Sequence, residues 1–150
     1  MNKSRAEQAV TNFIDTDLNC SQAVFSTYAE LLGLDAATAM KITDPFGGGI
    51  SGTAQTCGAV TGALMTIGLK YGFSLGNDIE KKKQTRSLSK KFLELFNERH
   101  GSTNCFGLLP VSINTEAGMT EAKENDYFKT KCPNFVRDAV EILEHILESN

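Results

Sequence analysis

The sequence predicts an all-α fold, a single-domain bundle of about five helices around a central helix at about 54–71. Apolar residues recur with a helical period in successive segments, and no segment shows the sustained apolar–polar alternation that is typical of a strand. The stretch 47–72 is rich in glycine and alanine and carries no charge before Lys70, which indicates a helix buried against close neighbours. With 150 residues, the chain is expected to form one domain, 1–150.

Three helices are expected before the glycine cluster, at residues 4–15, 19–33 and 35–42. Ser4 is followed by Glu7 in the pattern of a capping box, in which two side chains satisfy free backbone N–H groups at a helix start. Asn19 is the expected N-cap of the second helix, and Gly33 is its expected stop. Pro45 ends the third helix, because proline disfavours helical backbone at the residue before it.

A long polar helix is expected after the central helix. It should run from Asn77 or Asp78 to His100, because either first residue is a good N-cap and Gly101 is a good stop. Its apolar residues cover one face only, and the rest of its surface is charged. This helix should therefore bury one side and leave the other solvated.

The C-terminal third is expected to be less regular until its last helix. One helical turn should begin at Cys105, residues 111–120 should form a loop, and residues 120–127 should form a weak helical turn. The last helix should begin near Cys132-Pro133, since proline is favoured in a first turn. It carries a strong apolar stripe, which suits either the domain core or a homodimer interface.

Composition and charge exclude several classes of function. The net charge of −3 and the pI near 5.4 argue against nucleic-acid binding, which needs a basic surface. The N-terminal segment is polar and lacks the apolar core of a secretion signal. The central stretch is too polar and too rich in glycine at its start to insert into a membrane. We therefore expect a cytoplasmic location, no nucleic-acid partner and no membrane insertion.

The four cysteines are the candidate functional residues: Cys20, Cys57, Cys105 and Cys132. No two of them form a CxxC pair, so a local zinc-knuckle or thioredoxin-type arrangement is absent. Each lies at or near the predicted start of a helix, where free N–H groups and the helix dipole lower the pKa of a thiol. Cysteines that merely fill a core should lie on mid-helix faces, so this placement favours a functional set. His100 and His145, near helix ends, are expected to be exposed or to face the C-terminal dipole, not to be ligands.

Cys57 begins a CGAxxG motif, Cys57-Gly58-Ala59-Val60-Thr61-Gly62, with one cysteine upstream and two downstream. This arrangement resembles the bacterial and archaeal C_GCAxxG_C_C family of redox-active proteins over nearly the whole chain. The resemblance implies a redox role that depends on the four cysteines. A similar domain occurs in split-Soret cytochromes, which carry haem, but this chain has no CxxCH, so covalent haem is not expected.

Three residues of the motif are candidates for cofactor binding: Gly58, Thr61 and Gly62. Gly58 and Gly62 share one helix face, so a second helix or a cofactor could approach the backbone closely there. Thr61 lies one turn after Cys57 and could place a hydroxyl beside the sulfur. Tight helix packing alone would also explain the two glycines, and both explanations can hold together.

Three hypotheses follow for the function. In the first, the cysteines converge in a thiol–disulfide oxidoreductase with Cys57 as nucleophile, which exchanges electrons with a redox partner protein or a small thiol. In the second, the same four cysteines ligate zinc or an iron–sulfur cluster. In the third, the cysteines are inert, and the chain is a structural helical domain that binds a partner.

Overall fold

The structure is a computed structural model that describes residues 2–150, and these residues form helices and turns without a strand. The elements are α1 (Arg5–Ile14), α2 (Cys20–Phe25), α3 (Ala36–Thr43), the 3₁₀ turn η1 (Asp44–Phe46), α4 (Gly58–Tyr71), α5 (Ile79–His100), α6 (Cys105–Leu108), α7 (Glu116–Glu124), α8 (Tyr127–Thr130) and α9 (Cys132–Glu148). The all-α prediction is confirmed. The prediction of about five helices counts only the longer ones. The structure also has short helices, since α2, α6 and α8 have six, four and four residues.

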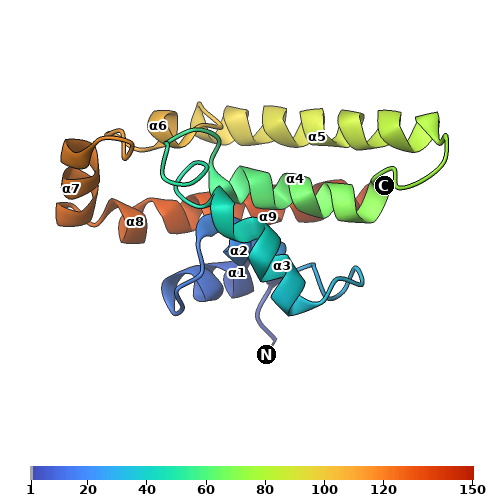
Figure 1. Cartoon of the computed structure of the whole chain (residues 1–150), viewed down its shortest axis with the longest axis horizontal. Helices are drawn as coiled ribbons and strands as arrows, with labels where there is room; N and C mark the ends of the chain where they lie inside the picture. Colours follow the sequence, from blue (N-terminus) through green and yellow to red (C-terminus); the bar gives the residue numbers. More distant parts are fainter. Residues whose placement is uncertain (1) are drawn as a thin grey trace.

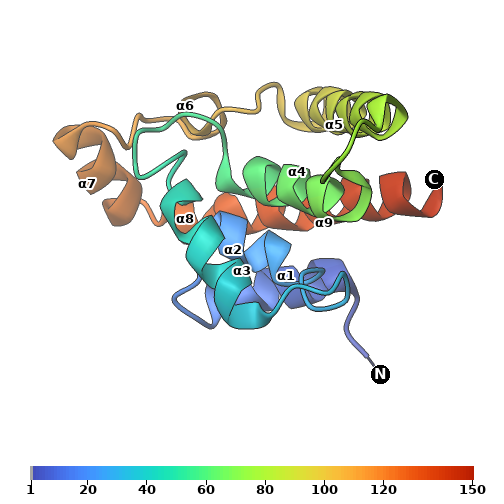
Figure 2. The same ribbon diagram turned by 45° about the vertical axis from the view of Figure 1, so that its right-hand side comes forward.

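The three longest helices, α4, α5 and α9, run side by side along the long axis of the molecule (Figures 1 and 2). Helices α1, α2 and α3 lie against α4 and α9 on the side away from α5, and α6, α7 and α8 lie at one end (Figure 1). Helices α4 and α9 both start at that end. None of the helices in residues 2–150 is both long and apolar enough to cross a membrane.

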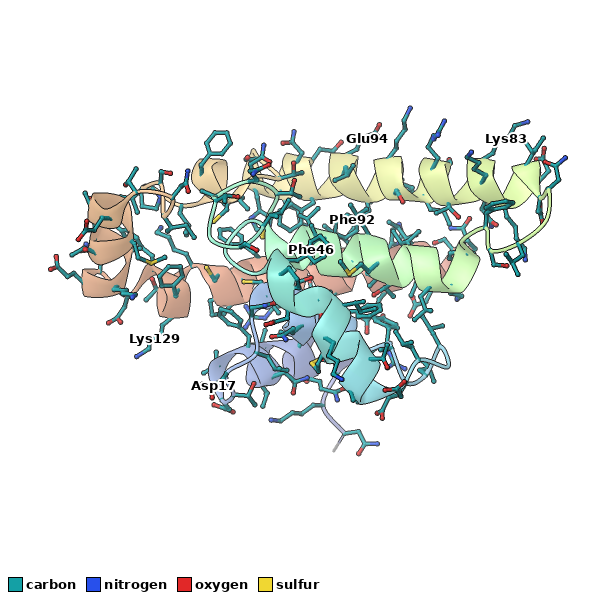
Figure 3. All side chains as sticks on the ribbon, viewed as in Figure 1. Asp17, Phe46, Lys83, Phe92, Glu94 and Lys129 are labelled. Atoms are coloured by element: carbon teal, nitrogen blue, oxygen red, sulfur yellow. The ribbon has the colours of Figure 1, made fainter. Side chains whose placement is uncertain are left out.

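The core is built between the three long helices. Helix α5 contributes Phe92 and Phe96, both fully buried, and Figure 3 places Phe92 between α5 and α4 while Lys83 and Glu94 project outward. Helix α9 contributes a fully buried stripe: Val136, Ala139, Val140, Leu143 and Ile146. Full burial of each large apolar side chain contributes about 1.5–3 kcal/mol. The apolar stripe of the last helix therefore serves the core of its own chain.

Helix α2 packs closely along α4 because α4 carries glycine at the points of contact. A Cβ atom on Gly62 would lie 2.7 Å from the carbonyl oxygen of Ser21, and one on Gly58 would lie 3.0 Å from the Ser21 nitrogen. Each glycine costs about 1 kcal/mol relative to alanine in a helix. The close packing of α2 offsets that cost, as the small-residue pattern of the central stretch predicts.

Helix starts and stops are confirmed where a polar cap or a glycine marks them. Ser4 and Glu7 make both hydrogen bonds of the capping box before α1. The side chains of Asn19 and Asp78 accept backbone hydrogen bonds at the starts of α2 and α5. Gly101 ends α5 in the left-handed conformation, with a φ of 76°.

The second helix is shorter than predicted, since α2 ends at Phe25 and the residues up to Gly33 form successive turns. The hydroxyl and the N–H group of Thr27 both donate to the carbonyl oxygen of Val24, at 2.7 and 3.2 Å. The N–H group of Thr27 thus bonds to the residue three positions back, as in a 3₁₀-helix, which is wound more tightly than an α-helix. Hydroxyl side chains compete for the carbonyl groups that an α-helix uses, so the helix stops although the apolar pattern continues.

The central helix begins at Gly58, four residues after its predicted start at 54. Ala54 has a left-handed φ of 60°, and Thr56 pairs with Asn104 in an isolated antiparallel bridge. Neither conformation is compatible with an α-helix. Cys57 is therefore the N-cap of α4, and the helix ends at Tyr71 as predicted.

Helix α7 occupies part of the segment 111–120, where a loop was expected. The Thr115 side chain accepts a hydrogen bond from the N–H group of Gly118 at 3.0 Å and starts the helix. A Cβ atom on Gly118 would collide with the carbonyl oxygen of Ser112, so this glycine allows the preceding loop to fold back on the helix. Ala122 is fully buried and anchors α7 to the body.

Candidate functional site

The four cysteines line one cavity of about 230 Å³: Cys20, Cys57, Cys105 and Cys132. Cys20, Cys105 and Cys132 are the first residues of α2, α6 and α9, and Cys57 is the N-cap of α4. The expected placement at helix starts is therefore confirmed for all four. The fold brings together residues that are far apart in the sequence, at the end of the molecule where α4 and α9 begin.

An isolated antiparallel bridge holds Cys57 beside Cys105. The N–H group of Cys57 donates to the carbonyl oxygen of Thr103 at 2.9 Å, and the N–H group of Cys105 donates to the carbonyl oxygen of Gln55 at 2.7 Å. These bonds join the segment before α4 to the segment before α6. Both cysteines are consequently fixed through their own backbone groups.

The start of α2 is held against α4 and the 3₁₀ turn η1. The Asn19 side chain accepts from the N–H group of Gln22 and donates to the carbonyl oxygen of Asp44, each at 3.0 Å. A Cβ atom on Gly58 would lie 3.0 Å from the Cβ atom of Cys20. The Asn19 cap and the close approach of Gly58 therefore set the position of the Cys20 side chain.

Cys20 and Cys132 influence each other's ionisation directly. The Cys20 thiol donates a hydrogen bond to the Cys132 sulfur, which lowers the pKa of Cys132 although burial opposes the shift. The same hydrogen bond, burial and the neighbouring cysteines raise the pKa of Cys20 well above its ordinary value. When this pair loses one proton, the charge settles on Cys132, at the start of a seventeen-residue helix.

Burial decides the pKa values of the other two thiols. It raises the pKa of Cys57 to about 12, although the N–H groups of Ala59 and Val60 at the helix start act in the opposite direction. It raises the pKa of Cys105 to about 11. The expected lowering at a helix start is therefore wrong for Cys57 and Cys105, because the penalty for burying a thiolate exceeds the effect of the helix end. It is also wrong for Cys20, whose pKa is raised by its interaction with Cys132 and by burial. Cys132 has the lowered pKa instead.

Most of the remaining cavity wall is apolar, and its apolar side chains were not singled out from the sequence: Phe13, Leu108, Leu109, Ile113, Phe128 and Phe135. A sequence signal existed for some of them. Phe135 lies one helical turn after Cys132, and Leu108 and Leu109 follow Cys105 within the next turn. Side chains that follow a helix-start cysteine by three or four residues lie on the same face as its sulfur.

A glycine-rich loop closes another part of the cavity. Residues 48–52 all have left-handed backbone, with φ between 51° and 77°. Gly48 and Gly49 line the cavity. A Cβ atom on Gly49 would lie 2.7 Å from the Cβ atom of Cys105, so the bare backbone of the loop packs directly on this cysteine.

The three candidates of the central motif separate in the structure. Gly58 lines the cavity beside Cys57. Gly62 faces Ser21 of α2 and permits helix packing. The Thr61 hydroxyl makes its hydrogen bonds with the Ser21 hydroxyl and the Gly58 carbonyl oxygen, at 3.2 and 3.0 Å. Thr61 and Gly62 therefore hold α2 in place and lie outside the lining of the cavity.

His100 supports the cavity wall from behind. Its ring packs between Phe96 and Phe135, with ring centroids 4.7 and 5.0 Å away. Its Nε2 atom lies 2.9 Å from Oδ2 of Asp138 on α9. With 13% of its side chain exposed, His100 is not a surface residue but a link between the end of α5 and the aromatic wall.

Among residues 2–150, no three His, Cys, Asp or Glu side chains are placed to hold one metal ion together. A zinc ion, which takes four ligands at about 2.0–2.3 Å, would require the cysteine side chains to move closer together.

Comparison with known proteins agrees with the cysteine pattern. An uncharacterised protein of Archaeoglobus fulgidus is 28% identical over 145 residues, which cover 92% of this chain and 90% of the relative. No solved structure matches the chain. A family model described as "Putative redox-active protein (C_GCAxxG_C_C)" matches residues 18–146, a segment that contains all four cysteines. In this chain the central glycine follows Cys57, whereas the family description writes it before the cysteine. The chain belongs to the C_GCAxxG_C_C family.

Proposed function

We propose that this chain is a dithiol–disulfide redox protein in which Cys20 and Cys132 are the reacting pair. Two observations support this proposal: Cys20 and Cys132 line the same cavity, and the interaction of their thiols lowers the pKa of Cys132. Thiol–disulfide exchange needs both features, a thiolate to attack and a second thiol to complete the reaction.

Cys132 takes the role of attacking thiolate, in place of Cys57, the nucleophile proposed from the sequence. The N-terminus of α9 and the Cys20 thiol both favour a negative charge on Cys132. Cys20 then acts as the resolving thiol, because it stays protonated until Cys132 has reacted. With pKa values of about 12 and 11, Cys57 and Cys105 remain neutral thiols that line the cavity.

A reducing cytoplasm, the expected location, would keep the pair in its dithiol form between reactions. All four cysteines are free in the structure, three of them buried and Cys20 partly exposed. Because a dithiol and its disulfide differ by two electrons, turnover requires a partner that accepts or donates two electrons.

Oxidation with one equivalent of diamide tests the proposal. Diamide takes up two electrons and two protons and converts two thiols into one disulfide. We expect the number of titratable thiols to fall from four to two, and peptide mapping to find the Cys20–Cys132 disulfide. Four thiols that survive oxidation, or a disulfide between any other two cysteines, would contradict the assignment. Replacement of Cys57 or Cys105 with Ala should leave the disulfide intact, whereas replacement of Cys20 or Cys132 should abolish it.

A second candidate is ligation of an iron–sulfur cluster by the same four cysteines. The convergence of all four on one cavity favours it, because four thiolates are the usual donor set of such a cluster. A cluster has several metal atoms and spaces its ligands more widely than a single ion does. Cys20, Cys57, Cys105 and Cys132 would hold it, and it would supply one-electron transfer. Iron and sulfide in the protein purified without air, with all thiols masked, would establish this function in place of the first.

A further inference from the structure

The cavity around the reacting pair restricts what can reach it. Cys132 is 7% exposed, and its neighbours Cys57 and Cys105 are 5% and 9% exposed. A disulfide held on the surface of a folded protein would not reach a sulfur at this depth, whereas a small molecule that enters the cavity would. Several residues of the cavity wall are partly exposed, Leu108 and Phe128 among them.

The residues that line the cavity also restrict the charge of a molecule that can bind in it. Apart from the cysteines, none of the residues that line the cavity is ionisable. Asn19 is polar, but both ends of its amide are already hydrogen-bonded within the chain. Two lysines adjoin lining residues in the sequence. Lys129 points out of the body in Figure 3, and Lys131 lies over the ring of Tyr127, 5.6 Å from its centroid. A buried carboxylate or ammonium group would find no partner here.

We propose that the substrate of the Cys20–Cys132 pair is a small, uncharged disulfide carried on a hydrocarbon frame, or the dithiol it forms on reduction. This inference rests on the proposed dithiol function. The cavity volume of about 230 Å³ fits a small ring and is below the range of about 300–1,000 Å³ that is usual for sites of larger ligands. A peptide thiol such as glutathione, with two carboxylates and an ammonium group, does not match either the size or the lining.

The exchange proceeds in two steps. The Cys132 thiolate, its proton released to solvent, attacks one sulfur of the substrate and forms a mixed disulfide, and the other substrate sulfur leaves as a thiolate and is protonated. The Cys20 thiol then loses its proton and attacks the Cys132 sulfur, which expels the substrate as a second thiol. The substrate disulfide gains two electrons and two protons, and Cys20 and Cys132 lose them to become a disulfide.

Two dithiols that differ only in charge test the inference. The protein is first oxidised with diamide to the Cys20–Cys132 disulfide and is then reduced with dihydrolipoamide, which is neutral, or with dihydrolipoate, which carries a carboxylate. We expect dihydrolipoamide to be faster by at least about tenfold, because burial of the carboxylate is unfavourable. Each rate is divided by the rate of the same dithiol with 2-hydroxyethyl disulfide in solution, which removes intrinsic differences between the reagents. Equal corrected rates, a faster carboxylate or no reaction with either dithiol would overturn the inference.

The first step separates this result from the proposed function. If diamide does not give the Cys20–Cys132 disulfide, the dithiol function itself is wrong. If the disulfide forms but the two dithiols do not differ, only the substrate class is wrong.

A cation placed in the wall should weaken or cancel the preference for dihydrolipoamide. Phe128→Lys introduces an ammonium group at the rim, and we expect it to accelerate dihydrolipoate relative to dihydrolipoamide by about tenfold. Phe106→Lys is the matched control, because Phe106 is 60% exposed, follows Cys105 in the chain and lies outside the cavity lining. Its rate ratio should equal that of the unmodified protein. If both lysines change the ratio equally, the effect comes from net charge and the cavity assignment fails. If Phe128→Lys does not fold, the comparison on the unmodified protein decides alone.

Discussion

Gly58 and Cys20 meet at the contact of α4 with α2: a Cβ atom on Gly58 would lie 3.0 Å from the Cβ atom of Cys20 and 3.1 Å from the carbonyl oxygen of Phe46. Gly58→Ala must therefore push α2 away and move the Cys20 thiol relative to Cys132. We expect the free energy of unfolding to fall by about 1–3 kcal/mol, as for other overpacked sites. Disulfide formation between Cys20 and Cys132 should also slow. Urea unfolding and the rate of thiol loss with diamide measure the two effects.

Gly68 provides the matched control on the same helix. A Cβ atom there meets nothing within 4 Å, so Gly68→Ala adds helix propensity without a contact. It should raise the free energy of unfolding by up to about 1 kcal/mol and leave the rate of disulfide formation unchanged. The close approach of α2 would be disproved if the two substitutions changed stability in the same direction.

Gly49 and Gly52 allow the contact of the glycine loop with Cys105 to be measured. Both have left-handed backbone, with φ of 66° and 77°, so alanine at either position costs about 1–2 kcal/mol. Only at Gly49 would the new Cβ atom meet the Cys105 Cβ atom, at 2.7 Å. Gly49→Ala should therefore lower stability clearly more than Gly52→Ala does, and it should make Cys105 more accessible to alkylation. Equal losses in urea unfolding would mean that the loop does not press on Cys105.

Local sequence signals predict where several helices of this fold start and stop. The caps at Ser4, Asn19 and Asp78 and the stop at Gly101 act within one helical turn, so they can be read without knowing the neighbours. The placement of Cys20 at the start of α2 follows from the Asn19 cap. The expectation that they converge was a hypothesis about distant segments, and the fold places all four around one cavity.

Features that depend on tertiary contacts could not be predicted in the same way. The start of α4 shifts because Thr56 pairs with Asn104, which lies in a distant part of the chain. The pKa of Cys57 depends on how deeply it is buried, and the pKa of Cys132 depends on a hydrogen bond from Cys20. A helix start alone favours the thiolate equally in all of these places, so the sequence pattern does not distinguish them.

The lowered pKa of Cys132 depends on a hydrogen-bond donor at position 20. Cys20→Ala removes the donor and leaves burial, which raises the pKa of a thiol, so the alkylation of Cys132 by iodoacetamide should shift to higher pH. Cys20→Ser keeps an O–H group near the sulfur and should shift the profile less. Mass spectrometry of the peptide that contains Cys132 follows this one thiol as pH is varied. A profile that is unchanged in Cys20→Ala would show that Cys20 is not the cause.

The buried thiols should make the fold sensitive to alkali. Below about pH 8.5, the ordinary pKa of cysteine, Cys57 is protonated in both the folded and the unfolded chain and adds no pH dependence. Above it, the unfolded chain loses this proton, while the folded chain keeps it until about pH 12. The free energy of unfolding should therefore fall by up to about 1.4 kcal/mol per pH unit for this group, and Cys105 should add a similar slope up to about pH 11. Cys132 has a lowered pKa, so its contribution has the opposite sign and is complete by the ordinary pKa. Urea unfolding at a series of pH values should give a shallower decline for Cys57→Ala than for the unmodified protein, and parallel curves would show that Cys57 is not protonated and buried as described.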